Sequence, residues 1–322
     1  MLLYNLLAGM FFHVVVISNC GVSMSRVFLA GLIVMLGQCL PLAAMAKPQI
    51  LASIKPLALI AQEVVGDNAH IETLLPTTAS PHDYPLKMSD HRHLRDADLV
   101  LWVGPELESF LARSLANIPP AKVMATYDLP DLHWPENTVE SDGHQHANHQ
   151  HTGGDPHLWL DPRNAQVIAR ALAARMIAID PQSARVYQAN AERFIARIQQ
   201  LDLQLNQQLA PIKSKGFAVY HEGYSHFVSR YGLHQVGYVT YAPERRPGAR
   251  HLRELHEVLK QEGKCLFVEP YYQVESIEAM AKAIGLRIGT LDPIGDQQVS
   301  SYQQLLEKLG QSFLACLTNL AG

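Results

Sequence analysis

The chain has 322 residues, of which 48% are hydrophobic and 17% are charged, a composition typical of a folded chain with one large domain or two smaller ones. It carries 26 basic and 30 acidic residues, a formal net charge of −4. This balance argues against proteins that bind nucleic acid through a basic surface. The sequence also lacks the glycine-rich signatures of nucleotide-binding loops and the G-x-S-x-G motif of serine hydrolases.

The first 46 residues are expected to be a leader rather than part of the fold. They contain no acidic residue and one basic residue, Arg26. From Met24 the chain reads MSRVFLAGLIVMLGQCLPLAAMA, a positive start, an apolar run and an A-x-A ending at Ala46, which is the form of a secretory signal peptide. We expect cleavage after Ala46, with translation starting either at Met24 or, for an unusually long leader, at Met1. A two-helix membrane anchor is the alternative.

Strand-length apolar runs alternate with helical patterns in two parts of the remaining chain. In the first part the runs QILASI, ADLVLWVG and AKVMAT are separated by PLALIAQEVVGD and PELESFLARSLANI. In the second part GFAVYH, HQVGYVTYA, KCLFVEP and LRIGTLDP alternate with ARHLRELHEVLKQEG and VESIEAMAKAIG. Strands that alternate with helices indicate parallel sheets. The sequence therefore predicts an α/β fold with two similar lobes and mostly parallel sheets.

A long helical region lies between the two parts and is broken once, at Asp180-Pro181, where proline can occupy a first helical position. From Gln182 to Leu209 one helix would span roughly 42 Å at 1.5 Å per residue. We expect it to be a rigid link between the lobes. Its apolar residues recur at spacings of three and four and form one stripe: Tyr187, Ala191, Phe194, Ile198, Leu201 and Leu205. The expected domains are a leader (1–46), an N-terminal lobe (47–180), a linking helix (181–212) and a C-terminal lobe (213–322).

A polar, histidine-rich segment, residues 133–154, interrupts the N-terminal lobe. Its apolar content is too low to offset the entropy of ordering, so we expect a mobile loop. The loop would hold metal ions weakly, as a secondary site, because ordering it costs entropy that a preformed site does not lose. A solvated insert without function is the alternative. Its histidines are His133, His144, His146, His149 and His151.

Three further histidines stand at or just after strand ends, where α/β proteins place their sites: His82, His157 and His221. Any one of them alone is more simply explained as a hydrogen-bonded structural residue. Together they favour a metal site, because three imidazoles suit zinc, copper, iron or nickel and leave one position for a carboxylate or water. Asp292 in TLDPIGD is the tentative fourth ligand, with water as the alternative. Glu269 in FVEP is expected to hydrogen-bond to one of the metal ligands and orient it.

The stretch HEGYSH is not a metalloprotease motif. H-E-x-x-H places two histidines four residues apart on one helical face, whereas His221 and His226 are five apart. On a helix these would point about 140° away from each other. A zinc hydrolase nevertheless remains the rival class, since three histidines and a water can generate a nucleophile. The chain offers only Glu269 as a candidate base.

Removal of the leader would leave two cysteines, Cys265 and Cys316. In an oxidising, exported compartment they are expected to pair. Two buried free thiols are the alternative.

Several motifs together carry a resemblance to a known family. They are SPHDYPLKMSD followed by ADLVLWVGPELESFL, DPHLWLDP after a histidine-rich loop, YHEGYSHFVSRYGL, and CLFVEP with GTLDPIG. Over nearly all of residues 48–322 the chain resembles the zinc-specific solute-binding proteins of bacterial ABC importers, the ZnuA type. The resemblance implies two lobes joined by a rigid helix, with the metal held in the cleft between them, and a disulfide in the C-terminal lobe.

Residue by residue, the resemblance implies that His82, His157 and His221 are the ligands. Manganese and iron relatives typically have glutamate at the third place, so His221 favours zinc. Some zinc members have an acidic residue immediately before the first histidine; here that residue is Pro81. The fourth ligand is therefore either Asp292 or water.

The implied function is capture rather than catalysis. The protein would bind zinc in the periplasm, dock as a monomer on an ATPase-driven membrane permease and release the ion into it. The histidine-rich loop would collect or sense zinc. A free-standing periplasmic zinc buffer or chaperone is the alternative.

Overall fold

In the computed structural model the chain from Lys47 onward forms one compact unit. The structure describes residues 46–135, 154–243, 245–272 and 274–318. The expected signal peptide therefore lies outside the described residues, apart from Ala46, and its cleavage stays a prediction. Within the described ranges, no helix combines the length and the apolar character needed to cross a membrane.

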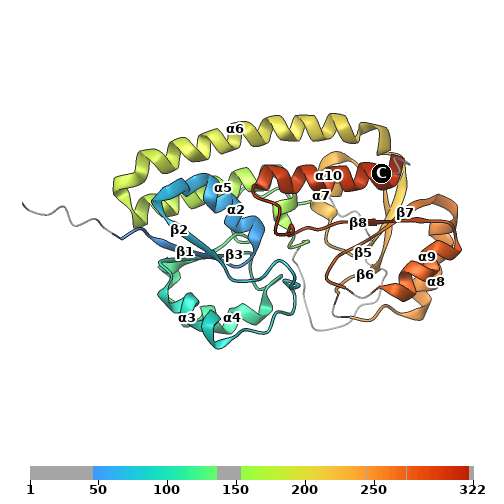
Figure 1. The fold of residues 1–322 in the computed structure, drawn as a ribbon, viewed down its shortest axis with the longest axis horizontal. Coiled ribbons are helices and arrows are strands. Elements are labelled where there is room, and N and C mark those ends of the chain that lie inside the picture. The colour runs from blue at the N-terminus through green and yellow to red at the C-terminus, as the bar shows by residue number, and fades with distance from the viewer. Residues whose placement is uncertain (1–45, 136–153, 244, 273, 319–322) are drawn as a thin grey trace, which may run out of the picture. The chain divides into compact units, whose positions relative to one another are not determined.

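The first lobe is built on a sheet of four parallel strands in the order β2-β1-β3-β4 (Figure 1). The strands are β1 (Gln49–Ala52), β2 (His70–Thr73), β3 (Leu99–Trp102) and β4 (Val123–Ala125). The helices of this lobe that alternate with them are α2 (Lys55–Val65), α3 (Met88–Asp96) and α4 (Ser109–Leu115). Every residue of β3 is buried, as expected for a central parallel strand covered on both faces.

The second lobe repeats this arrangement with a parallel sheet in the order β6-β5-β7-β8. Its strands are β5 (Gly216–His221), β6 (Gln235–Thr240), β7 (Gly263–Val268) and β8 (Arg287–Thr290). Its helices are α7 (Ser225–Tyr231), α8 (Ala249–Glu262), α9 (Glu275–Ala283) and α10 (Tyr302–Thr318). The predicted class, two similar α/β lobes, is confirmed, and all strand pairings among the described residues are parallel.

Two helices connect the lobes, α5 (Pro162–Ile179) and α6 (Ala184–Leu209), and they are separated at the predicted Asp180-Pro181 break. All six residues of the predicted apolar stripe on α6 are buried. Figure 1 shows α6 passing over both lobes, with α2 and α5 beneath one half of its length and α10 beneath the other, and it contacts all three helices. One hydrophobic core therefore continues from the first lobe through α6 into the second. The domain limits at 180 and 212 stay predictions.

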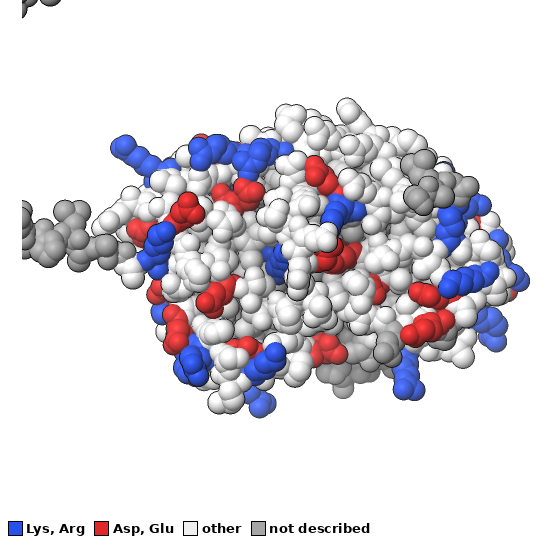
Figure 2. Space-filling view, viewed as in Figure 1, with Lys and Arg blue, Asp and Glu red and all other residues white. Residues whose placement is uncertain are grey.

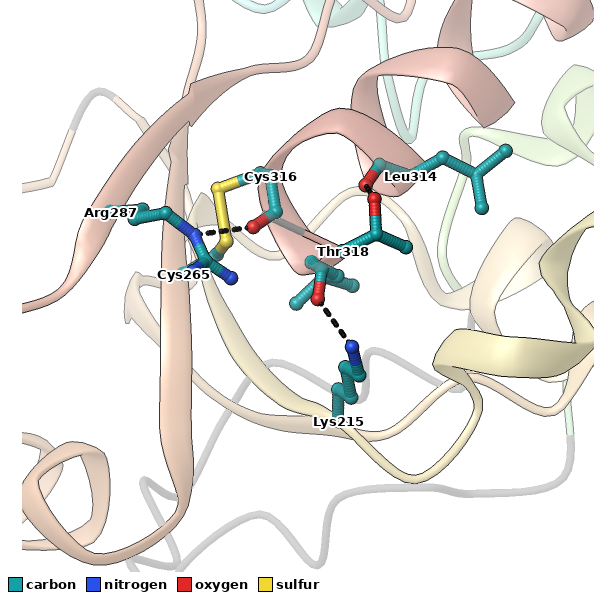
Figure 3. The surroundings of a disulfide bond; sticks show 7 residues. Lys215, Cys265, Arg287, Leu314, Cys316 and Thr318 are labelled. Carbon is teal, nitrogen blue, oxygen red and sulfur yellow. Dashed lines mark hydrogen bonds between the residues drawn. A yellow bond between two sulfur atoms is a disulfide. The ribbon is translucent and has the colours of Figure 1, made fainter. Parts of the chain in front are cut away.

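The end of α10 is fastened to the second sheet. Cys265 on β7 and Cys316 on α10 form a disulfide with their Cα atoms 6.2 Å apart, so the predicted pairing is confirmed (Figure 3). The Arg287 Nε–H donates to the carbonyl oxygen of Cys316 at 2.6 Å, and Lys215 Nζ donates to that of Leu317 at 2.8 Å. These two cations meet carbonyl groups that have no partner within the helix, which stabilises its C-terminus.

Charged side chains are interspersed on the described surface shown in Figure 2, where lysines and arginines lie beside aspartates and glutamates. Ion pairs among the described residues include Arg197 with Glu63 and Lys308 with Asp296. Exposed pairs of this kind contribute little to stability, typically about 0–1 kcal/mol.

Glu108 is a buried carboxyl group at the end of the first sheet. Its Oε2 accepts the N–H of Val103 at 2.7 Å, whereas its Oε1 is buried without a partner. Burial raises the pKa of Glu108 to about 7, although the neighbouring Ser53 and the backbone N–H groups of Val103 and Gly104 act in the opposite direction. Because the folded pKa lies above the unfolded one, stability is fully present below the unfolded pKa and is lost as the pH rises through about 7.

Glu108→Gln is therefore expected to remove this loss. The free energy of unfolding of the variant should exceed that of the wild type by roughly 2–3 kcal/mol at pH 8, and the difference should shrink toward pH 5. Urea unfolding at both pH values measures it, with the exposed neighbour Glu106→Gln as the control. Parallel pH dependences in wild type and Glu108→Gln would show that Glu108 does not titrate in this range.

Candidate metal centre

Three histidines from three different segments meet between the sheets. His82 lies in the loop after β2, His157 precedes the short 3-10 turn Leu158–Leu160 that leads into α5, and His221 is the last residue of β5. One candidate ligand atom from each lies within 4.8 Å of the others. The ring centroids are 5.0–5.2 Å apart. The structure thus brings together the three histidines that the sequence singled out.

The Nε2 atoms of these histidines have no hydrogen-bond partner. All three are buried, and none meets a donor or acceptor among the residues that the structure describes. A buried polar atom without a partner costs free energy, so three in one place require an explanation. A cation at their meeting point would give each nitrogen lone pair a partner. The donor set therefore fits a metal ion that prefers imidazole.

Two of the three rings are held through their other nitrogen. His157 Nδ1 lies 2.6 Å from Asp155 Oδ1, and His221 Nδ1 lies 2.5 Å from Glu269 Oε1. A carboxylate accepts the Nδ1–H in each case, which fixes the tautomer with Nε2 as the free acceptor. Both rings are thereby oriented with the coordinating atom toward the centre of the cluster.

Glu269 is itself held in place. Tyr224 donates its hydroxyl to Glu269 Oε1 at 2.9 Å, and both residues are buried. Burial opposes protonation of His221, but the charge and hydrogen bond of Glu269 outweigh it and raise the pKa of His221. Burial likewise opposes ionisation of Asp155, yet the contacts with His157 hold the pKa of Asp155 well below its ordinary value.

His82 has no such carboxylate, and its ionisation differs accordingly. Burial, followed by the neighbouring His157 and His221, lowers the pKa of His82 to about 2. The ring is therefore neutral at physiological pH. A neutral imidazole has a free lone pair, which is the form that binds a metal.

Glycine at position 223 leaves the space that an ion would need. A Cβ atom built there would lie 2.5 Å from His221 Nε2 and 2.9 Å from His157 Cε1. Any side chain at Gly223 would thus enter the centre of the cluster. This close approach explains a glycine at a position where the turn itself imposes no positive φ.

Asp292, the tentative fourth ligand, is not brought to this group. Its Oδ1 accepts the N–H of Ile294 at 3.1 Å, the N–H of Gly295 at 2.9 Å and the hydroxyl of Tyr271. The Asp292 carboxylate thus accepts hydrogen bonds from backbone N–H groups of the turn that begins at this residue. Among the described residues no carboxylate joins the three histidines, and the identity of a fourth ligand stays a prediction.

The histidine-rich segment is described only at its ends. His133 is anchored through its backbone, because its N–H donates to Asn164 Oδ1 at 2.7 Å and its carbonyl accepts from Asn164 Nδ2 at 3.0 Å. The other predicted histidines of the looser site lie outside the described residues: His144, His146, His149 and His151. That site stays a prediction.

Sequence reasoning missed Asp155, Gly223 and Tyr224. Asp155 stands two residues before His157 in DPHLWL, and the other two lie in HEGYSH, so all three were in view as parts of motifs. Their roles depend on how the turns direct side chains, which spacing does not reveal. An acidic residue two positions before a candidate ligand was the available signal for Asp155.

The family model for the periplasmic component A of zinc-uptake complexes, ZnuA, matches residues 50–316. The chain belongs to the ZnuA family. The ZnuA protein of the high-affinity zinc uptake system of Yersinia pestis is 35% identical over 294 residues, which cover 85% of this chain and 92% of that protein. Its counterpart in Haemophilus ducreyi is 32% identical over 292 residues, 85% of this chain and 94% of that protein.

Solved structures share the fold. A crystal structure of ZnuA superposes with a TM-score of 0.71 at 24% identity, over 84% of this chain and all of that one. The periplasmic zinc-binding protein TroA of Treponema pallidum gives a TM-score of 0.72 at 19% identity, over 84% of this chain and 99% of that one. At these identities the likeness establishes the two-lobed ZnuA-type fold.

Proposed function

We propose that this chain captures zinc in the periplasm and delivers it to the membrane permease of an ABC importer. One observation carries the proposal: three buried imidazole nitrogens without partners converge between the lobes of a member of the ZnuA family. The relatives named as high-affinity zinc uptake proteins support it. The site is then a carrier site, and zinc is its cargo.

The proposed ligands are His82, His157 and His221, with water in the fourth position. Three neutral nitrogen donors suit zinc, whereas manganese, magnesium and calcium prefer oxygen. Asp155 and Glu269 would orient two of the ligands and strengthen them as donors. Copper(II) would be expected to bind more tightly in vitro, so selection for zinc depends on which metals are available.

Capture is favoured over hydrolysis. A zinc hydrolase needs a general base that is free to take a proton from the metal-bound water. Glu269 Oε1 already accepts from His221 and Tyr224, and both oxygens of Asp155 accept from neighbouring groups. Asp155 and Glu269 therefore hold ligands, which a carrier requires, and we propose that the protein is not an enzyme.

A growth test separates delivery from storage. A bacterial strain that lacks its own zinc-binding component should recover growth under zinc limitation when this chain is expressed with a cognate permease intact. It should not recover when that permease gene is deleted. Recovery without the permease would instead support a free-standing periplasmic zinc buffer or chaperone.

A further inference from the structure

One carboxylate, that of Asp155, contacts both lobes at once. Its Oδ1 accepts from His157 Nδ1 at 2.6 Å and from the His157 N–H at 3.0 Å, within the first lobe. Its Oδ2 accepts from the Ser225 hydroxyl at 2.6 Å and from the Ser225 N–H at 3.1 Å. Ser225 is the first residue of α7, in the second lobe. Hydrogen bonds to an ionised carboxylate are roughly twice as strong as neutral ones.

The backbone of Asp155 makes a further contact with the second lobe. His226 Nε2 lies 2.8 Å from the carbonyl oxygen of Asp155, and because a carbonyl only accepts, Nε2 carries the proton. The other nitrogen, Nδ1, lies 3.4 Å from the Asn164 amide nitrogen, which can donate to it. Because both ring nitrogens of the buried His226 have partners, this residue holds the neighbourhood of Asp155 rather than a metal.

Glu269, the carboxylate behind His221, differs in this respect. Its hydrogen-bond partners, His221 and Tyr224, belong to the same lobe as Glu269 itself. Movement of one lobe against the other would leave that arrangement intact. The same movement would separate Asp155 from Ser225.

A second contact between the lobes lies behind His157 and does not involve a ligand. Trp159 Nε1–H donates to the carbonyl oxygen of Pro293 at 2.8 Å, and Tyr302 donates its hydroxyl to the carbonyl oxygen of Trp159 at 2.6 Å. Trp159 and Tyr302 are fully buried. This contact would keep the lobes associated while the Asp155–Ser225 contact opens.

We propose that Asp155 is a positioning residue that couples the orientation of His157 to the contact between the lobes. The inference rests on the proposed zinc capture. While Ser225 holds Oδ2, Oδ1 stays fixed on His157 Nδ1 and Nε2 stays directed at the metal. When the lobes part, the carboxylate loses two donors and turns toward water, which releases His157. Zinc release and lobe separation are then one linked event.

Substitution of Ser225 tests the coupling without touching a ligand. Ser225→Ala removes the hydroxyl but keeps the backbone N–H, and should speed zinc dissociation by about 10- to 150-fold, the effect of one charge-assisted hydrogen bond. Ser225→Thr keeps a hydroxyl and should restore the wild-type rate. Ser229→Ala, at an exposed position of the same helix, is the control. Stopped-flow dissociation into excess chelator gives the rates for the full mature chain.

Substitution of Asp155 tests the positioning itself. Asp155→Asn should weaken zinc binding by about 10- to 100-fold, the usual effect of removing the partner of a metal-binding histidine. The ¹⁵N chemical shifts of the His157 ring distinguish positioning from a purely structural role, because a loss of stability alone would not change them. In the wild type they should report a proton fixed on Nδ1, and in Asp155→Asn a mixture of tautomers.

The outcomes separate the inference from the function on which it rests. If Ser225→Ala and Ser229→Ala release zinc at the same rate while the wild type binds tightly through His157, the coupling is wrong and capture stands. If Asp155→Asn lowers the melting temperature of the metal-free protein but leaves the His157 tautomer unchanged, Asp155 is merely structural. If the wild type binds no zinc tightly, or binds it independently of His157, the proposed function itself fails.

Discussion

His157→Ala is expected to weaken zinc binding by roughly a hundred- to a thousandfold. Four-ligand zinc sites contribute about 10–16 kcal/mol, so one ligand accounts for roughly a quarter of that free energy. The variant would lose both the nitrogen that binds zinc and the hydrogen bond between Asp155 and the imidazole ring. Competition between the mature chain and a zinc chelator of known affinity measures the change.

Two further variants make this result specific. His234→Ala removes an exposed histidine of the second lobe and should leave the affinity unchanged. Replacement of residues 136–153 by a short glycine-serine linker keeps the anchored ends, including Trp134 and Gly154, whose ring and backbone are in contact. That deletion should abolish only the weak zinc binding and leave the tight zinc binding unchanged. Tight binding that survives His157→Ala but not the deletion would place the principal site in the histidine-rich segment.

Gly223→Ala is expected to weaken zinc binding at least a hundredfold while the fold persists. The added methyl group would lie 2.5 Å from His221 Nε2 and 2.6 Å from His221 Cε1, in the region that the ion must occupy. Zinc binds imidazole nitrogen at about 2.0–2.1 Å, so the methyl group and the ion cannot share this space. The methyl group meets two buried rings that carboxylates hold in place, so we also expect a loss of stability of about 1–3 kcal/mol.

The measurement for Gly223→Ala combines zinc titration with thermal unfolding of the metal-free protein. Gly248→Ala is the matched control, because a Cβ at Gly248 meets nothing within 4 Å. Zinc affinity of Gly223→Ala within threefold of the wild type would show that the ion lies elsewhere.

The fold could be predicted from the sequence to the level of two parallel α/β lobes and the helix between them. Runs such as LVLW have the length and apolar character of a buried strand, and the stripe from Tyr187 to Leu205 has the period of a helix. The strand orders β2-β1-β3-β4 and β6-β5-β7-β8 could not be predicted, because an apolar run does not specify which strands it pairs with in a sheet. The position of α10 could not be predicted either; this helix of the second lobe packs on α2 and α6.

The site could be predicted only in part. His82 and His221 follow strands, and parallel sheets place the carboxyl ends of their strands on one side, so their approach could be expected. Asp292 also follows a strand, yet its carboxylate satisfies the turn after β8 instead. No apolar run of strand length stands just before Asp155 in the sequence, and its contact with Ser225 joins residues 70 positions apart, which local sequence cannot reveal. Carboxylates were therefore harder to place than histidines.

The most direct test of the central claim is a crystal structure of the mature protein with one equivalent of zinc, with anomalous diffraction recorded above and below the zinc absorption edge. The account predicts one strong anomalous peak about 2.0–2.1 Å from the Nε2 atoms of His82, His157 and His221. A strong peak elsewhere, with these three nitrogens left without a metal, would contradict it.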